Sequence, residues 1–414
     1  MKNISPLFKT NNKVTFASLL VAIGIIYGDI GTSPLYALRA IIGKREITEM
    51  LVYGGISCIF WTLMFQTTIK YVWIALKADN QSEGGIFSLY ALIKRFGKKR
   101  FAILAIIGAT TLLADGIITP PISVSSAIEG LNMLSHLQNF IVPGNSLTIG
   151  IIIFILSFLF LFQRFGTDVI GKTFGPVMTI WFLMLLITGL IQIGHHPDIL
   201  KSLNPYYAYN LLSNYPQGFW LLGAVFLCTT GAEALYSDLG HTNIKNIRIS
   251  WIFVKISLIA AYLGQAAWLM HQGVTYLNDR NPFFEIMPQW FLLPSIIIAT
   301  LATIIASQAL ISGSYTLINE AINLNFWPRV TVRQPTEKKG QIYVPSVNII
   351  LWIGCILMVL YFKKSEHMEA AYGFSITITM LMTTLLLCIF LMYILKWKKI
   401  YVYIFLIIFG TIEG

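Results

Sequence analysis

The chain has 414 residues, of which 56% are hydrophobic and only 11% are charged, and its mean hydropathy is +0.71. These values exclude a soluble globular domain. The formal net charge of +11 would suit a nucleic-acid-binding protein, so the placement of the positive residues along the chain has to decide that question.

Long apolar runs recur from one end of the chain to the other, each close to or above the ~20 residues that a membrane-spanning helix needs. We therefore predict an all-α polytopic membrane protein with about eleven spans. Residues 1–13 are polar and basic, so no cleavable signal peptide is expected. The predicted spans are 14–38, 51–76, 101–128, 147–163, 173–194, 217–239, 249–271, 290–315, 344–362, 371–395 and 399–411.

Lys and Arg are distributed unevenly between the two sides of the predicted membrane. With the amino terminus in the cytoplasm, the cytoplasmic segments hold 20 of them and the opposite segments hold 7. This bias predicts a cytoplasmic amino terminus. It also accounts for the positive net charge by topology, so no nucleic acid is expected as a partner. The four cysteines lie in apolar runs without metal-binding spacing, and we expect them to pack or to face lipid.

The first predicted span contains a carboxylate, Asp29, between two glycines. Residues 32–34 (Thr-Ser-Pro) form a typical helix start, so the helix should break near Tyr27 and begin again. The first half-helix would then direct free carbonyl groups at the gap. Together with Asp29 and the Tyr36 hydroxyl, these carbonyls would suit an alkali cation. The alternative is that Asp29 only caps the second half-helix.

The third span repeats this pattern. Asp115, Thr119 and Ser123 are spaced four residues apart and share one helix face. The prolines at 120–121 lack amide hydrogens, so the carbonyls of residues 116–117 lose their usual partners and become further cation ligands. A simple proline kink with a packed polar face is the alternative.

The sixth span has a polar segment around Gly231, which permits local unwinding. Thr230 and Glu233 are predicted to share a helix face. Glu233, Asp29 and Asp115 lie at similar depths from the predicted cytoplasmic surface, so the three acids can meet at one site. Three carboxylates in a dry site require cations or protons, which makes all three candidates for proton coupling.

Other polar residues in or near the spans are weaker signals. Glu129 is either a gate or a solvated helix end, and residues 88–99 are expected to form a basic interfacial helix. The remaining residues are expected to be solvated or to pack between helices: Asp238, Glu320, His195, His196, Ser307, Gln308, Ser312 and Ser314.

Seven segments of the chain resemble, in order, those of the KUP (HAK/KT) family of potassium uptake transporters: 24–38, 82–92, 118–131, 228–238, 306–313, 341–345 and 370–373. The resemblance implies a LeuT-like (APC-type) core in residues 1–395, with ten helices in two inverted five-helix repeats and broken first and sixth helices. It implies potassium uptake across the bacterial cytoplasmic membrane, coupled to protons. Residues 396–414 would be a partial additional span, with the family's usual carboxy-terminal cytoplasmic region absent.

By motif position, the family's potassium ligands map onto Asp29, Tyr36, Asp115, Thr119, Ser123, Thr230 and Glu233. The expected partners are potassium, protons and the lipid bilayer; no cofactor is expected, and a homodimer is left open. A carrier of an organic substrate on the same fold, a channel and a truncated non-transporting remnant are the alternatives. The sequence contains no nucleophile triad, phosphate-binding loop or metal motif, so an enzyme is not expected.

Overall fold

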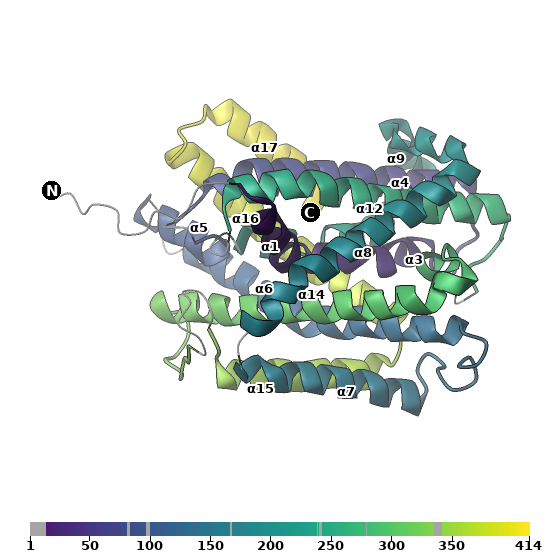
Figure 1. The fold of residues 1–414 in the computed structure, drawn as a ribbon. Helices are drawn as coiled ribbons and strands as arrows, with labels where there is room; N and C mark the ends of the chain where they lie inside the picture. Colours follow the sequence, from purple (N-terminus) through teal and green to yellow (C-terminus); the bar gives the residue numbers. More distant parts are fainter. Residues whose placement is uncertain are drawn as a thin grey trace.

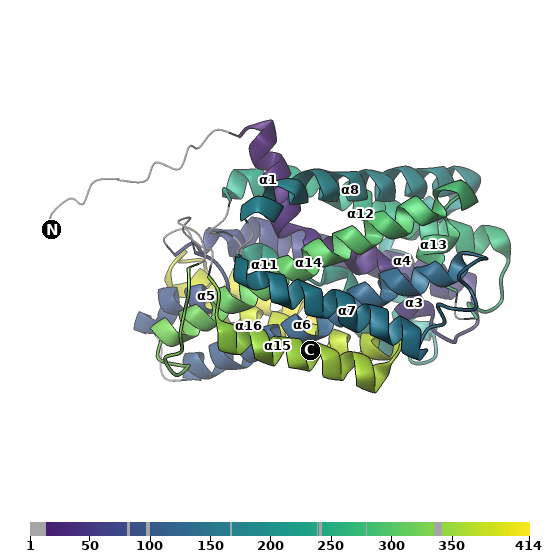
Figure 2. The ribbon, with the colours of Figure 1, turned by 60° about the horizontal axis from the view of Figure 1, so that its bottom comes forward.

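The computed structural model describes residues 14–80, 83–96, 100–165, 168–237, 239, 242–278, 280–334 and 342–414. The described residues form a bundle in which most of the long helices run in nearly the same direction, while α1 and α8 cross them obliquely (Figure 1). A second view shows α7 and α15 lying side by side along one flank (Figure 2). The predicted all-α class is confirmed.

The first half of the chain contains two interrupted spans and three long helices. The first span consists of four pieces, and the second continues from an α-helix into a π-helical stretch. The elements are α1 (Phe16–Ile26), α2 (Gly28–Thr32), η1 (Ser33–Leu35), α3 (Ala37–Ile42), α4 (Glu49–Thr62), η2 (Leu63–Ile74), η3 (Ala75–Lys77), α5 (Ile86–Ile93), η4 (Lys94–Phe96), α6 (Arg100–Glu129), η5 (Gly130–Met133), α7 (Ser146–Phe162), η6 (Gln163–Phe165) and α8 (Asp168–His195).

The second half opens with short pieces and continues with long helices. The sixth span is interrupted between η9 and α11. The elements are η7 (Pro197–Leu203), α9 (Pro205–Asn214), η8 (Gly218–Trp220), α10 (Leu221–Val225), η9 (Phe226–Thr229), α11 (Ala232–Ser237), α12 (Ile244–Gln272), α13 (Pro282–Glu285), α14 (Gln289–Asn323), α15 (Pro345–Phe362), α16 (Ser365–Tyr393) and α17 (Lys399–Glu413).

All eleven predicted apolar runs coincide with helical segments. Among the described residues, seven helices are long and apolar enough to cross a membrane, and the bent pair of Phe16–Ile26 and Gly28–Leu35 makes an eighth. Ser146–Phe162 and Gly218–Thr229 are shorter apolar helices, so the total of about eleven spans stays a prediction. Several helices extend beyond the apolar runs because polar residues continue the helix outside the hydrocarbon region. For example, α14 reaches Asn323, eight residues past its predicted end at 315.

Glycines allow the broken first span to pack closely against α8. A side chain at Gly24 would collide with the backbone of Gly175, and one at Gly175 would collide with the backbone of Leu20. A similar close contact between glycines joins α8 and α12, where Gly189 and Gly264 face each other. Small residues at helix contacts are typical of membrane proteins. Helices in lipid gain nothing from the hydrophobic effect when they associate, so close packing has to stabilise the contact.

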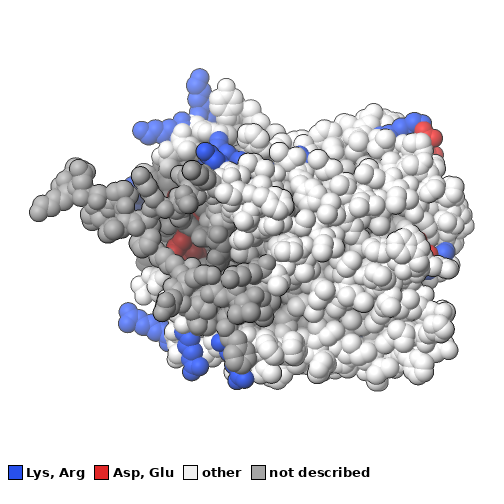
Figure 3. All heavy atoms as spheres, viewed as in Figure 1, with Lys and Arg blue, Asp and Glu red and all other residues white. Residues whose placement is uncertain are grey.

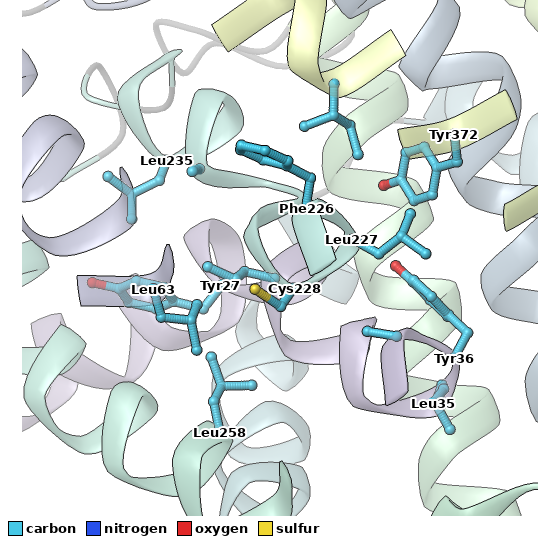
Figure 4. Close-up of a cluster of buried hydrophobic side chains, with 14 of the residues drawn as sticks. Tyr27, Leu35, Tyr36, Leu63, Phe226, Leu227, Cys228, Leu235, Leu258 and Tyr372 are labelled. Atoms are coloured by element: carbon cyan, nitrogen blue, oxygen red, sulfur yellow. The ribbon is translucent and has the colours of Figure 1, made fainter. Parts of the chain in front are cut away.

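The interrupted spans lie in the middle of the bundle. Figure 4 shows Phe226 and Cys228 of η9 among side chains of the first, second and seventh spans, including Tyr27, Leu63 and Leu258. All four cysteines of the chain are buried, so they pack inside the protein and do not face lipid. The surface in Figure 3 is largely uncharged, with Lys and Arg concentrated at the ends of the bundle.

Candidate functional site

The two helix breaks meet each other. The first span bends by 70° between α1 and α2, at Tyr27. The sixth span unwinds at Gly231, whose φ of +80° is in the region that favours glycine. A Cβ atom on Gly231 would lie 3.0 Å from Oδ2 of Asp29 and 2.7 Å from the Ile30 nitrogen. The predicted breaks in the first and sixth spans are therefore confirmed, and they are in contact at Asp29.

The two aspartates belong to one chain of hydrogen bonds. Thr119 Oγ1 lies 2.6 Å from Asp115 Oδ1 and 2.6 Å from the Tyr372 hydroxyl. The Tyr372 hydroxyl in turn lies 3.4 Å from Asp29 Oδ1. All four side chains are buried, and Asp29 Oδ2 has no hydrogen-bond partner among the described residues. A buried carboxylate oxygen without a donor is costly, and a bound cation or a proton would satisfy it.

Hydroxyl groups extend the cluster across the two breaks. Ser33 Oγ and Thr230 Oγ1 are 2.6 Å apart, and the Tyr36 hydroxyl lies 3.5 Å from Thr230 Oγ1. The rings of Tyr36 and Tyr372 are 6.2 Å apart between centroids. Thus five of the seven predicted ligands gather in one region, which we call the aspartate cluster; its members are Asp29, Ser33, Tyr36, Asp115, Thr119, Thr230 and Tyr372.

The other two predicted ligands have different surroundings. Ser123 lies one turn beyond Thr119 on α6, and its buried Oγ has no hydrogen-bond partner in the described part of the chain. Glu233 lies on α11 and accepts a hydrogen bond from the Tyr71 hydroxyl of η2. The prediction that Thr230 and Glu233 share one helix face is wrong, because Thr230, with ψ of 142°, precedes the first residue of α11.

The predicted carbonyl ligands are also placed differently. The prolines of α6 do leave the carbonyls of Gly116 and Ile117 without amide donors, but these oxygens lie 3.9 and 3.4 Å from the Cys355 sulfur of α15. They therefore have a thiol as a neighbour, and their role as cation ligands stays a prediction. The Tyr27 carbonyl accepts the Gly31 amide at 2.9 Å, so it is not free either. Both differences arise because the tertiary contacts and the second half-helix satisfy the groups that the sequence leaves open.

Side chains from other helices hold the broken first span in place. Trp181 Nε1 donates to the Gly31 carbonyl at 2.9 Å, and Gln265 Nε2 donates to the Pro34 carbonyl at 3.1 Å. Asn281 Nδ2 donates to the Leu35 carbonyl at 2.9 Å. Unwound backbone at membrane depth is tolerated where such donors satisfy it. These three side chains escaped the sequence analysis because each is far from the break in the chain.

An ion-pair network lies one helical turn from the cluster. Arg39, three residues after Tyr36, contacts Glu369 Oε1 at 2.6 Å and Glu129 Oε2 at 3.7 Å. Glu129 also accepts hydrogen bonds from the backbone nitrogen and hydroxyl of Ser365, at 3.0 and 2.5 Å. The alternative of a solvated helix end is therefore wrong for Glu129, while the gate stays a prediction.

Arg39 and Glu129 line a cavity of about 780 Å³ at this end of the bundle, together with charged residues that include Arg280 and Glu285. Burial raises the pKa of the Glu285 carboxyl above its usual value, and the nearby Arg280 partly offsets the rise. Arg39, whose ion pairs lie at the wall of this cavity, is three residues from Tyr36 of the aspartate cluster.

The weaker signals divide as follows. His195 is exposed as expected, whereas His196 is half-buried with Nε2 3.4 Å from the Tyr53 hydroxyl. Glu320 lies inside α14 and accepts a hydrogen bond from Ser88, so the prediction that it is solvated is wrong. Ser307 and Ser314 donate to carbonyls of their own helix, as packing residues do. The helix predicted over 88–99 is present as α5 and η4 up to Phe96, and its location at a membrane interface stays a prediction. Residues 97–99 and Asp238 lie outside the described residues.

Three comparisons with known proteins bear on this site. Residues 16–414 match the family described as the K+ potassium transporter integral membrane domain. The chain is 56% identical over 396 residues to a probable potassium transport system protein Kup of Flavobacterium johnsoniae, covering 94% of this chain and 59% of that protein. It is 52% identical over 411 residues to a protein of the same name from Clostridium perfringens, covering 97% of this chain and 62% of that protein. The chain thus spans about three fifths of the length of these relatives.

Two solved structures have a similar fold. The structure of MhsT in complex with L-phenylalanine matches with a TM-score of 0.62 and 10% identity, covering 97% of this chain and 99% of that one. A manganese transporter from Eremococcus coleocola matches with a TM-score of 0.51 and 12% identity, covering 96% of this chain and 84% of that one. At these identities the likeness concerns the fold alone, and it confirms the predicted LeuT-like core.

Proposed function

Because this chain belongs to the K+ potassium transporter family, we propose that it carries potassium into the cytoplasm as a potassium:proton symporter that works by alternating access. The observation that carries the proposal is the unpartnered Oδ2 of Asp29 at the contact between the two helix breaks. A transported cation would bind where this oxygen, a second buried aspartate and several hydroxyl groups lie together.

The chemistry of the aspartate cluster suits a hard monovalent cation. Its side chains offer only oxygen atoms, which hard cations prefer, and none offers the nitrogen or sulfur of a transition-metal site. The described residues contain no group of three His, Cys, Asp or Glu side chains placed to hold a metal ion. We therefore propose that potassium binds with carboxylate and hydroxyl oxygens in place of water.

The two buried carboxylates support the proposed proton coupling. Asp29 and Asp115 are joined through the Tyr372 and Thr119 hydroxyls inside a buried region, where two unneutralised charges would repel each other. One potassium ion and one proton would neutralise both. A membrane potential of 100 mV supplies about 2.3 kcal/mol per unit charge, against about 1.4 kcal/mol per tenfold accumulation. The membrane potential alone therefore limits the accumulation of potassium, and a co-transported proton would raise that limit by adding driving force.

The proposed location is the bacterial cytoplasmic membrane with the amino terminus in the cytoplasm. The bias of Lys and Arg along the chain supports this orientation. In that orientation the cavity beside Arg39 opens to the outside, and the break at Tyr27 lies closer to the cytoplasm than Tyr36 does. The Arg39 ion pairs would then close the site from the outside.

The test uses a bacterial strain without potassium uptake of its own and measures the uptake of rubidium. We expect uptake by the wild-type chain and a loss of at least tenfold in the Asp29→Asn variant, which removes the charge that compensates the cation. The matched control is Asp198→Asn, because Asp198 is an exposed partner of Lys201 in η7. Wild-type protein that reaches the membrane and takes up no rubidium would refute the proposal.

Two further measurements separate the parts of the proposal. Rubidium uptake that does not respond to an imposed proton gradient would exclude the symport step and leave a uniporter. Competition by amino acids or other organic solutes would favour the alternative of an organic substrate. Two carboxylates at the site oppose the binding of a substrate carboxylate there, so we expect no competition.

A further inference from the structure

A buried ion pair connects the second span with the last helix. Lys70 Nζ of η2 lies 2.6 Å from Glu413 Oε1 of α17, and both side chains are fully shielded from solvent. Lys70 also donates to the Met380 carbonyl at 2.8 Å, and Thr384 donates to Glu413 Oε2 at 2.7 Å. Both charged groups therefore have charge and hydrogen-bond partners, which is the condition for keeping an ion pair in a dry interior.

This ion pair is adjacent to Glu233. Tyr71, the residue after Lys70, donates its hydroxyl to Glu233, and the Lys70 ammonium lies 4.7 Å from the centroid of the Tyr71 ring. Thr383 of α16 lies beside both the Tyr71 hydroxyl and the Glu233 carboxylate. One aromatic ring thus separates a fixed positive charge from a carboxylate in the interrupted sixth span. The π-helical form of η2 accompanies this arrangement, and π-helical turns occur often at functional sites.

We propose that Lys70 and Glu413 are positioning residues whose paired charges set the electrostatic potential at Glu233, and hence the affinity of the carrier for its cation. The inference rests on the proposed function, because it assigns Glu233 to the path of the transported ion. While the pair is intact, its two charges act on Glu233 with opposite signs, and the charge of Lys70 acts more strongly than that of Glu413. The loss of either partner leaves a full unit charge on the far side of the Tyr71 ring from the Glu233 carboxylate. The buried surroundings screen that charge only weakly.

The sign of the effect distinguishes this role from a structural one. Glu413→Gln leaves Lys70 uncompensated, and its positive charge should raise the KM for rubidium about tenfold. Lys70→Gln leaves the Glu413 carboxylate uncompensated and removes the stronger of the two charges, so it should lower the KM by at least as large a factor. A pair that only attaches α17 to the bundle would instead reduce transport in the same direction in both variants.

The experiment measures KM and maximal rate of rubidium uptake for four proteins: the wild type, the two single variants, and the Lys70→Gln/Glu413→Gln double variant. The glutamine pair keeps hydrogen bonding while removing both charges, so we expect its KM to return to within about twofold of the wild type. The matched control is Lys201→Gln, which breaks the exposed ion pair with Asp198 and should leave KM unchanged. The amount of folded protein in the membrane is measured for every variant.

Each outcome decides the inference. Opposite shifts in KM that cancel in the double variant support it, and equal shifts or none in folded protein overturn it. If a single variant does not accumulate, Glu413→Asp takes its place; it keeps the negative charge, so we expect its KM to stay within about twofold of the wild type, and a tenfold shift in KM would overturn the inference. A wild-type chain without rubidium uptake overturns the proposed function as well, whereas a working wild type with unaltered variants overturns this inference alone.

Discussion

The Tyr372→Phe variant tests whether the aspartate cluster works as one unit. Tyr372 is fully buried on α16, and its hydroxyl is the only recorded link between the Thr119–Asp115 pair and Asp29 in the described part of the chain. The substitution removes one oxygen atom and keeps the ring, so the packing against Tyr36 should remain. The change is therefore confined to hydrogen bonding.

The size of the expected change in KM follows from the contacts of the Tyr372 hydroxyl with Thr119 and with Asp29. The 2.6 Å bond with Thr119 is short, whereas the 3.4 Å contact with Asp29 is long and contributes less. A hydrogen bond within a charged network contributes about 1.5–3 kcal/mol. Since about 1.4 kcal/mol is a factor of ten, we expect the KM for rubidium to rise roughly 10- to 100-fold.

The assay is the concentration dependence of rubidium uptake, together with the thermal transition of the detergent-solubilised protein. The matched control is Tyr315→Phe, which removes a buried hydroxyl bonded to Asn348 at 2.5 Å, between α14 and α15. It should lower stability by about 1–3 kcal/mol and leave KM unchanged. If Tyr372→Phe leaves KM within twofold of the wild type in folded protein, the cluster does not act as we describe.

Two further variants test the geometry around the site. Gly231→Ala should abolish uptake or prevent folding, because a φ of +80° strains any other residue by about 1–3 kcal/mol and the added Cβ would press on Asp29. The control is Gly194→Ala, at an open position of a helix. Equal rubidium uptake by the two variants would contradict the contact between the two helix breaks. Arg39→Gln should destabilise the protein by about 3–5 kcal/mol, because Glu369 would stay buried without its cation. Arg39→Lys keeps the charge and should lose less, and an unchanged thermal transition for Arg39→Gln would show that the ion pair contributes nothing.

The breaks in the first and sixth spans could be predicted because their causes are local. Glycine alters the backbone whatever surrounds it, and both breaks occur where expected. The second half-helix begins at Gly28, however, and not at the predicted Thr-Ser-Pro start, where only the short η1 begins without a side-chain cap. Helix periodicity likewise placed Asp115 and Thr119 on one face, where they are hydrogen-bonded. Acidic residues in the middle of a predicted span can be recognised from the sequence as candidate functional residues, because lipid offers a charge no partner.

The partners of these groups could not be predicted in the same way. Periodicity gives the face on which a residue lies, but not which helix packs against that face, so Tyr372 was missed although it lies in the 370–373 segment. For the same reason the sequence did not show that the Gly116 and Ile117 carbonyls, predicted as cation ligands, lie beside Cys355 of α15. No sequence pattern singles out Lys70 within the predicted span 51–76, yet it is buried against Glu413, 343 residues away in the chain.

The sequence by itself determined the number of apolar runs, the places where the backbone breaks and the presence of acids in the membrane, because each depends on residues within a few turns of one another. Only the tertiary structure decided that Asp29 and Asp115 are linked through the Tyr372 and Thr119 hydroxyls while Glu233 bonds to Tyr71. Those contacts join residues on different helices. They depend on how the helices pack against one another, which single-sequence patterns do not encode.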